Sequence, residues 1–330
     1  MIVTLTLNPA IDHTVVVDDL VPGDTNRAPS CRTDIGGKGI NVSRVLRELG
    51  CPSTAMGFVS GTTGRFIEHT LADRNIPRDF VHVRGGQTRT NITIVERRRE
   101  LTTTINEPGP YTDPHFFNLL LTRLKRRLQP GDWLVIGGSV PPPLPTTVYA
   151  EVITLAKKLG VVTVLDADGP ALAAGIEAGP FMVKPNRREL QRLLGRGPRK
   201  VETMLEAAER IYACGVSVVV VSQGVEGAVA VSDEGEWQVV PPVVQAESAV
   251  GSGDAMVAGM VLVLSGGGTM EEALRLGTAA GSATALTPGT EPCHQEDVAR
   301  LLPLVAVRQV RGDTPARRPA LALRMRGTSS

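Results

Sequence analysis

Aromatic residues are scarce in this chain, at 3% of its 330 residues, and the formal net charge at pH 7 is only +1. Proteins that bind nucleic acids usually carry a basic surface, and many offer aromatic side chains on which bases stack. The small net charge and the few aromatic residues therefore argue against nucleic acid as a partner. A small-molecule ligand is the better expectation.

Cysteine and long apolar runs are also lacking. The four cysteines, Cys31, Cys51, Cys214 and Cys293, lie far apart and form no C-x-x-C pair or Cys/His cluster. We expect reduced thiols rather than a zinc site, with some of them in the core. No apolar run approaches the ~18 residues of a membrane span, and Met1 leads directly into IVTLTL without the basic segment of a signal peptide. These features predict a cytoplasmic protein that has no membrane partner.

Hydrophobic residues, at 42%, and charged residues, at 21%, occur in the proportions of an ordinary globular protein. Strand-like apolar runs at 2–7, 133–136, 161–165, 181–183 and 216–221 alternate with helical patterns such as 39–49. An unbroken run such as VSVVVV suits a strand that is buried on both faces of a sheet. The alternation predicts an α/β fold in which helices cover both faces of a mostly parallel sheet, as a three-layer αβα sandwich.

Two segments interrupt this alternation. Residues 14–20 and 88–105 resemble strands with no helix between them, and both are polar at alternate positions. We interpret them as a small second sheet, a lid inserted into the main domain of 1–306 at about 12–34 and 86–107. From Val307 onward the chain is rich in arginine, with Asp313 as its only acidic residue, and 307–330 is predicted to be a disordered tail.

The strongest local signal for chemistry is the sequence Gly251-Ser252-Gly253-Asp254, which opens an apolar helical stretch. Glycines at the start of a helix let backbone N–H groups approach an anion, which the helix dipole also favours. A carboxylate beside an anion hole repels phosphate, so Asp254 suggests a base that accepts a proton from an attacking hydroxyl. Taken alone, the motif is explained better by an aspartate that caps the helix.

A second glycine-rich helix start contains Gly37, Lys38 and Asn41. It lacks the G-x-x-x-x-G-K-[ST] spacing of a Walker A loop, and a polyol or sugar phosphate suits it better than a nucleotide. A tight turn from strand to helix with a solvated lysine explains it equally well.

A third glycine-containing loop follows the most strand-like run of the chain and contains Ser222, Gly224 and Gly227. Glycines at the carboxyl end of a strand favour a loop that binds nucleotide phosphates. A hairpin turn into 228–231 is an equal alternative.

The sequence Lys184-Pro185-Asn186-Arg187-Arg188-Glu189 follows another short buried strand. Asn186 and Glu189 lie near one face of a starting helix, where they could order Mg²⁺ through water molecules. The same two residues also fit a capping box, and both interpretations can hold together.

Taken in order, these motifs resemble the PfkB family of carbohydrate kinases, with the ribokinase-like fold, from residue 2 to about residue 302. The resemblance rests on NPAxD at 8–12, GGKGINVSRVL, TRTN at 88–91, Gly138-Ser139, KPNRREL, SQGVEG and VGSGDAM. NPAxD, GKGINV and TRTN point to the hexose-phosphate branch. Ser252 stands where alanine is usual in the family.

The resemblance implies a role for each of these residues. Asp254 would be the catalytic base, with the amides of Gly251, Ser252 and Gly253 as the anion hole. The sugar would be held by Asp12, Gly37, Lys38 and Asn41, and its existing phosphate by Arg89 and Ser139. An arginine suits that phosphate because its planar donors bond two oxygens at once. The nucleotide would be held by Lys184, Ser222, Gly224 and Gly227, and Mg²⁺ by Asn186 and Glu189 through water.

The family suggests several activities and one mode of assembly. KPNRREL and the segment 235–237 favour ATP-dependent phosphorylation of fructose 1-phosphate to fructose 1,6-bisphosphate. Tagatose 6-phosphate and fructose 6-phosphate are the alternative substrates, because each presents a phosphate and a hydroxyl to nearly the same groups. An alternative of another class is a sugar-phosphate sensor without turnover. We also expect a homodimer that forms through the lid sheets.

Overall fold

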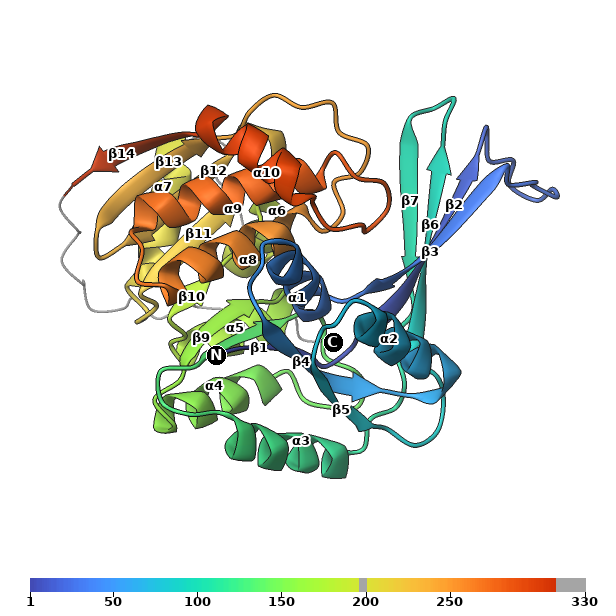
Figure 1. Cartoon of the computed structure of the whole chain (residues 1–330), viewed down its shortest axis with the longest axis horizontal. Coiled ribbons are helices and arrows are strands. Elements are labelled where there is room, and N and C mark those ends of the chain that lie inside the picture. The colour runs from blue at the N-terminus through green and yellow to red at the C-terminus, as the bar shows by residue number, and fades with distance from the viewer. Residues whose placement is uncertain (196–200, 313–330) are drawn as a thin grey trace.

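A computed structural model of the chain describes residues 1–195 and 201–312, and a ten-stranded sheet is its centre (Figure 1). The strand order is β14-β13-β12-β11-β10-β9-β8-β1-β4-β5. The strands from β5 to β11 pair in parallel, and β12, β13 and β14 are added in antiparallel fashion. Their bounds are β1 (Ile2–Thr6), β4 (Ser53–Val59), β5 (Arg78–His82), β8 (Trp133–Gly137), β9 (Val162–Asp166), β10 (Met182–Val183), β11 (Val218–Ser222), β12 (Ala228–Ser232), β13 (Gly235–Val240) and β14 (Ala306–Arg311).

Helices cover both faces of this sheet. One hydrophobic cluster joins it to α3 (Pro114–Arg127), α4 (Val148–Lys158), α5 (Gly169–Glu177), α6 (Arg187–Leu194) and α7 (Val201–Tyr212). Two further clusters lie on the other face, with α1 (Lys38–Glu48), α2 (Gly61–Asp73), α8 (Ser252–Ser265), α9 (Met270–Thr284) and α10 (Gln295–Leu301). A short 3₁₀ turn, η2 (Leu302–Leu304), follows α10. The predicted α/β sandwich with a mostly parallel sheet is confirmed.

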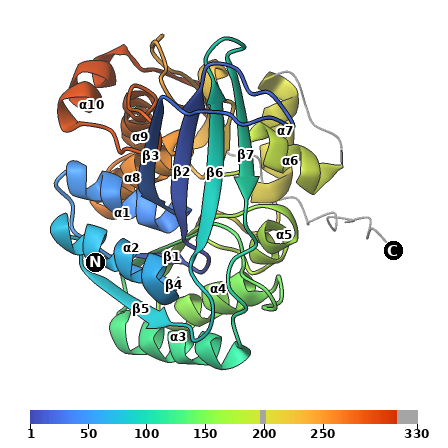
Figure 2. The same cartoon turned by 90° about the vertical axis from the view of Figure 1, so that its right-hand side faces the viewer.

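A separate four-stranded sheet projects from the main body (Figures 1 and 2). It corresponds to the small second sheet that the sequence predicts. Its order is β3-β2-β6-β7, with β2 (Ala10–Val17), β3 (Ser30–Gly36), β6 (Arg89–Glu96) and β7 (Leu101–Asn106). The strand-like segment 88–105 is an antiparallel hairpin of two of these strands. On one face, Ile92 lies opposite Ile105, and they are 37% and 55% exposed respectively.

The prediction of a disordered tail from residue 307 is wrong for the first residues of that segment. Residues Ala306–Arg311 form β14, which pairs with β13 at the edge of the main sheet, so the ordered chain extends past residue 306. Val307 and Val310 suit a strand, and Arg311 lies within 3.3 Å of carboxylates of Glu209 and Glu236. The rest of that prediction, 313–330, lies outside the described residues.

Two of the predicted absences can be compared with the structure. Within 1–195 and 201–312, no helix is both long enough and apolar enough to span a membrane. All four cysteines are free thiols, and Cys293 is buried in the core, as expected.

Candidate active site

The carboxyl ends of the parallel strands meet the amino-terminal ends of α1 and α8, and most of the predicted site residues gather there. Lys38 opens α1, and Asp254 lies in the first turn of α8. Lys184 directly follows β10, and Asp166 ends β9. Ligands of open α/β sheets bind at this edge, because the loops that leave neighbouring strands diverge there.

The start of α8 forms an amide-rich surface beside a buried lysine. Gly251 precedes the helix with φ of 85°, a left-handed conformation that glycine adopts without strain. A side chain at Gly253 would place its Cβ only 3.1 Å from Nζ of Lys184. The first N–H groups of a helix have no partner within it, so this end of α8 and the ammonium of Lys184 both face any anion that binds here.

Asp254 is 8% exposed, and a specific contact orients its carboxylate. Its Oδ2 accepts a hydrogen bond of 2.8 Å from Nδ2 of Asn41. The buried guanidinium of Arg44 donates to Oδ1 of Asn41 at 3.3 Å, which fixes the amide so that its NH₂ group faces Asp254. Sequence reasoning missed Arg44, because its place in an otherwise polar helix face gave no sign of burial.

Burial raises the pKa of Asp254 to about 7, and the nearby carboxylate of Asp166 contributes to the increase. Lys38, Asn41 and Lys184 act in the opposite direction without cancelling it. A carboxylate with a pKa near neutrality can both accept and release a proton at physiological pH, which suits a general base.

Asp254 belongs to a cluster of buried charges that includes two lysines. Nζ of Lys38 lies 2.6 Å from Asp166 and 3.2 Å from Glu189, and Nζ of Lys184 lies 3.2 Å from Asp166. Burial works against the charge on Lys38, but these carboxylates raise its pKa overall. Three carboxylates thus share two ammonium groups, and the unmatched negative charge helps explain why Asp254 holds its proton more strongly.

Asp166 was not singled out from the sequence, although it holds both lysines. Burial works against its charge, but Lys184 and Lys38 lower its pKa overall, so it remains ionised. The available signal was its place in DADG, directly after the predicted strand 161–165. An acidic residue at the carboxyl end of a buried parallel strand has the position of a ligand-site residue.

Asn186 and Glu189 form the predicted capping box at the start of α6. The side chain of Asn186 accepts a bond from the amide of Glu189, and Oε2 of Glu189 accepts one from the amide of Asn186. The other oxygen of Glu189 faces Lys38. The structural role is therefore present. Within the described residues no group of three or more His, Cys, Asp or Glu side chains could hold a metal alone, so an ion here would need water or substrate oxygens.

The base of the lid brings a second set of predicted residues together. Nε of Arg89 donates to the carbonyl of Asn8 at 3.2 Å, and Nδ2 of Asn8 donates to Oγ of Ser139 at 3.0 Å. Asn8 thus connects the two residues expected to bind the sugar's phosphate. Burial lowers the pKa of Arg89, which the charge of Asp12 opposes.

Asp12 lies beside this group, where Nδ2 of Asn91 donates to its Oδ1 at 2.9 Å. A Cβ at Gly36 would lie 2.0 Å from the other oxygen of Asp12. Only glycine leaves room for the carboxylate here, so the glycine pair at the start of α1 allows Asp12 to approach the site. Gly37 follows with φ of 121°.

The third glycine loop connects β11 to β12 through a short 3₁₀ turn, η1 (Gly224–Glu226). The backbone is the antiparallel hairpin that the alternative interpretation described. Ser222 lies next to Asn186 through an isolated parallel bridge, so the loop and the start of α6 are neighbours. Arg187 joins them by donating to Gln223 at 3.0 Å and by pairing with Glu226.

Comparison with known proteins agrees with this arrangement. A model of the pfkB family carbohydrate kinases matches residues 5–297. The chain is 34% identical to 1-phosphofructokinase of Borreliella burgdorferi, covering 94% of this chain and 99% of that protein. It is 37% identical to 1-phosphofructokinase of Bacillus subtilis, covering 93% and 99%. A crystal structure of Escherichia coli phosphofructokinase-2 in complex with fructose-6-phosphate has a TM-score of 0.85 at 33% identity, covering 92% of this chain and 98% of that one. This chain belongs to the pfkB family of carbohydrate kinases.

Proposed function

We propose that the chain transfers the γ-phosphoryl group of ATP to the free primary hydroxyl of fructose 1-phosphate, with fructose 1,6-bisphosphate as the product. The observation that supports it best is Asp254, a buried carboxylate with a pKa of about 7 at the first turn of α8, beside Lys184. Two similar proteins carry the name 1-phosphofructokinase.

In this mechanism Asp254 accepts the proton of the attacking hydroxyl as the bond to phosphorus forms. The amides of Gly251, Ser252 and Gly253 would stabilise the negative charge of the transferring group, and the ammonium of Lys184 beside Gly253 would add a positive charge. Phosphoryl transfer depends mainly on alignment and on such charge stabilisation. The hydrogen bond from Asn41 keeps the carboxylate in one orientation for the proton transfer.

We place the sugar between the start of α1 and the base of the lid. Asp12, Gly37, Lys38 and Asn41 would contact its hydroxyl groups, and Arg89 with Ser139 would bind its phosphate. Lys38 is held at 2.6 Å from Asp166, so its ammonium lies toward the phosphoryl-transfer side of this space. A phosphate dianion suits Arg89, whose guanidinium is partly desolvated and therefore binds an anion more strongly.

ATP would lie over the loop of Ser222, Gly224 and Gly227, with Lys184 near its terminal phosphate. Val225 in this loop is 92% exposed, and an exposed apolar side chain there suits contact with a base. Asn186 and Glu189 would order Mg²⁺ through water, and the ion would neutralise phosphate charge when bound.

A coupled assay of ADP release tests the choice of sugar. Fructose 1-phosphate, fructose 6-phosphate and tagatose 6-phosphate are compared at equal enzyme concentration, and fructose 1-phosphate should give the highest kcat/KM. A higher value for another sugar would overturn this choice. Fructose 6-phosphate is the second candidate, because a similar solved structure holds it. Tight sugar binding without any ADP release would indicate a sensor instead.

The assembly is part of the same proposal. We infer a cytoplasmic homodimer in which the lid sheets of two subunits pack on each other, with a kinase domain that includes β14. Its support is the apolar face of the lid, where Ile92, Leu101 and Ile105 are exposed. A small sheet with such a face is stabilised by a partner.

A further inference from the structure

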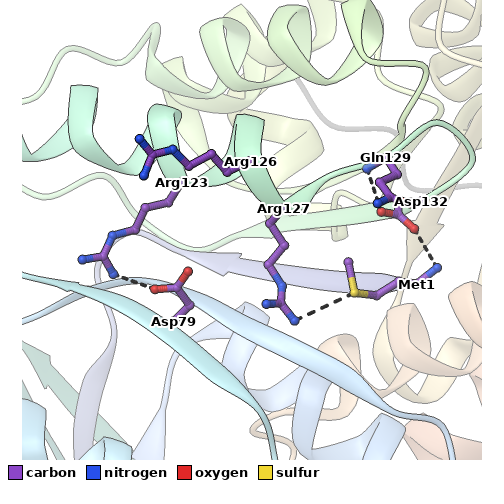
Figure 3. Close-up of a pocket in the computed structure, with 7 residues that line it drawn as sticks. All are labelled: Met1, Asp79, Arg123, Arg126, Arg127, Gln129 and Asp132. Carbon is purple, nitrogen blue, oxygen red and sulfur yellow. Dashed lines mark hydrogen bonds and ion pairs between the residues drawn. The ribbon is translucent and has the colours of Figure 1, made fainter.

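A hollow lies at the end of the main sheet opposite Asp254, and no step of the proposed reaction uses it. Its volume is ≈ 610 Å³, which falls within the range of small-molecule sites. Asp79 near the start of β5 and Asp132 just before β8 place it at the amino-terminal ends of the parallel strands. Arg123, Arg126 and Arg127 from the last two turns of α3 form its opposite side (Figure 3).

The acidic residues of this hollow are already paired. Asp79 lies 2.6 Å from Nη1 of Arg123, which also donates to the carbonyl of Phe80. Asp132 accepts hydrogen bonds from the terminal ammonium of Met1 at 2.8 Å and from the backbone amide of Gln129 at 2.9 Å. Neither carboxylate is therefore available to neutralise the two remaining arginines.

Arg126 and Arg127 form no ion pair with any residue that the structure describes. Nη2 of Arg127 donates to Oγ1 of Thr54 at 2.7 Å, so the guanidinium is held against the strands. In Figure 3, Arg123 and Arg127 extend from α3 toward the strands, and Arg126 runs along the helix with its guanidinium directed away from that of Arg127. Two arginines without carboxylate partners among the described residues thus line the hollow.

A purely structural explanation accounts for part of this arrangement. Basic residues in the last turn of a helix interact favourably with its dipole, and Lys125, Arg126 and Arg127 all lie there. The dipole explains why the residues are basic, but not why they border a hollow or why Arg127 is anchored to Thr54. Guanidinium groups bind phosphate oxygens through paired N–H donors, more specifically than an ammonium does.

We propose that this hollow binds a small phosphate-bearing anion at a site separate from the active site. A compact anion matches the volume of this open hollow. The phosphate groups would lie against Arg127 and against Arg126, whose exposed side chain would turn toward the ligand. Arg123 would remain paired with Asp79. The hollow lies at the end of the sheet opposite Asp254, so a ligand bound there would not contact the reacting groups. It would act as an effector rather than as a substrate.

Calorimetric titration of the full chain with inorganic pyrophosphate, at physiological ionic strength, tests the proposal. Arg126→Gln should weaken binding about tenfold, the effect of losing one charge-assisted contact. Lys125→Gln is the matched control, because it removes the same charge from the adjacent exposed position without lining the hollow. Lys125→Gln should leave the affinity unchanged, and kinase activity in both variants confirms that they fold.

Two further variants separate the site from its alternatives. Arg127→Lys keeps the positive charge but removes the paired donors, and should also weaken binding. Arg89→Ala alters the active site alone, and pyrophosphate should still bind the hollow of this variant. Equal effects of Arg126→Gln and Lys125→Gln, loss of all binding in Arg89→Ala, or no binding at millimolar pyrophosphate would each overturn the proposal.

Discussion

At the scale of single residues, the proposed chemistry depends on Asp254. Its position at the start of α8 suits both a helix cap and a base, and the structure gives it no capping bond from its own helix start. Among the described residues, its side chain accepts a hydrogen bond from Asn41 alone, which lies on another helix. A carboxylate that is buried near a second acid, Asp166, is costly, so its presence here favours a role in the reaction.

Replacing Asp254 with asparagine tests this role. The change keeps the size of the side chain but removes its charge and its ability to accept a proton, so kcat should fall by about 10² to 10⁴. The dissociation constants of sugar and ATP should change little, since the other contacts remain. Steady-state kinetics and equilibrium binding on the folded variant measure both effects. A kcat within a few-fold of wild type would show that the residue only caps the helix.

The raised pKa gives an independent test through pH. Asp254 can accept a proton only when ionised, so kcat/KM should fall about tenfold per pH unit below pH 7 and level off above it. Phosphate groups of the substrates also titrate near pH 6. The residual activity of Asp254→Asn separates the two causes, because it should lose the limb near pH 7. If that limb persists in the variant, it belongs to another group.

At the scale of elements, the lid carries Arg89 from β6 to the edge of the main sheet. Arg89→Ala should raise the KM for the sugar phosphate by about tenfold to a hundredfold, the loss of one charge-assisted contact. The KM for ATP should stay nearly constant, because the proposed nucleotide loop lies beyond β11. Arg97→Ala, an exposed residue just past the other end of β6, is the matched control. If only the KM for ATP changed, Arg89 would belong to the nucleotide site, and its assignment to the sugar phosphate would be wrong.

Elements were easier to predict than the site they form. The runs 2–7, 133–136 and 161–165 became β1, β8 and β9 because unbroken apolar segments have few other stable environments. Asp166 and Arg44 were missed because their roles depend on residues far away in sequence, Lys184 and Thr290 among them. β14 was missed because a short arginine-containing strand becomes stable only against its neighbour, β13.

At the scale of the whole molecule, the exposed apolar face of the lid predicts a homodimer. Ile92 and Ile105 share one face, and Ile105→Glu would place a charge in an apolar contact between subunits. Light scattering at micromolar concentration should show a dimer for wild type and a monomer for this variant. Thr104→Glu, on the opposite face of β7, should leave the mass unchanged. A monomeric wild type would remove the basis for the proposed dimer.

The arginines of β14 have a consequence for solubility. β14 is the last strand of the sheet, so within the described residues one row of its backbone N–H and C=O groups has no strand beside it. Such an edge can recruit strands from other chains and begin aggregation, and charged side chains oppose this. Arg311 is paired with Glu209 and Glu236, whereas Arg308 forms no ion pair with a described residue and places a positive charge on that edge. We therefore expect the charge of Arg308 to oppose the addition of further chains to this edge at high protein concentration.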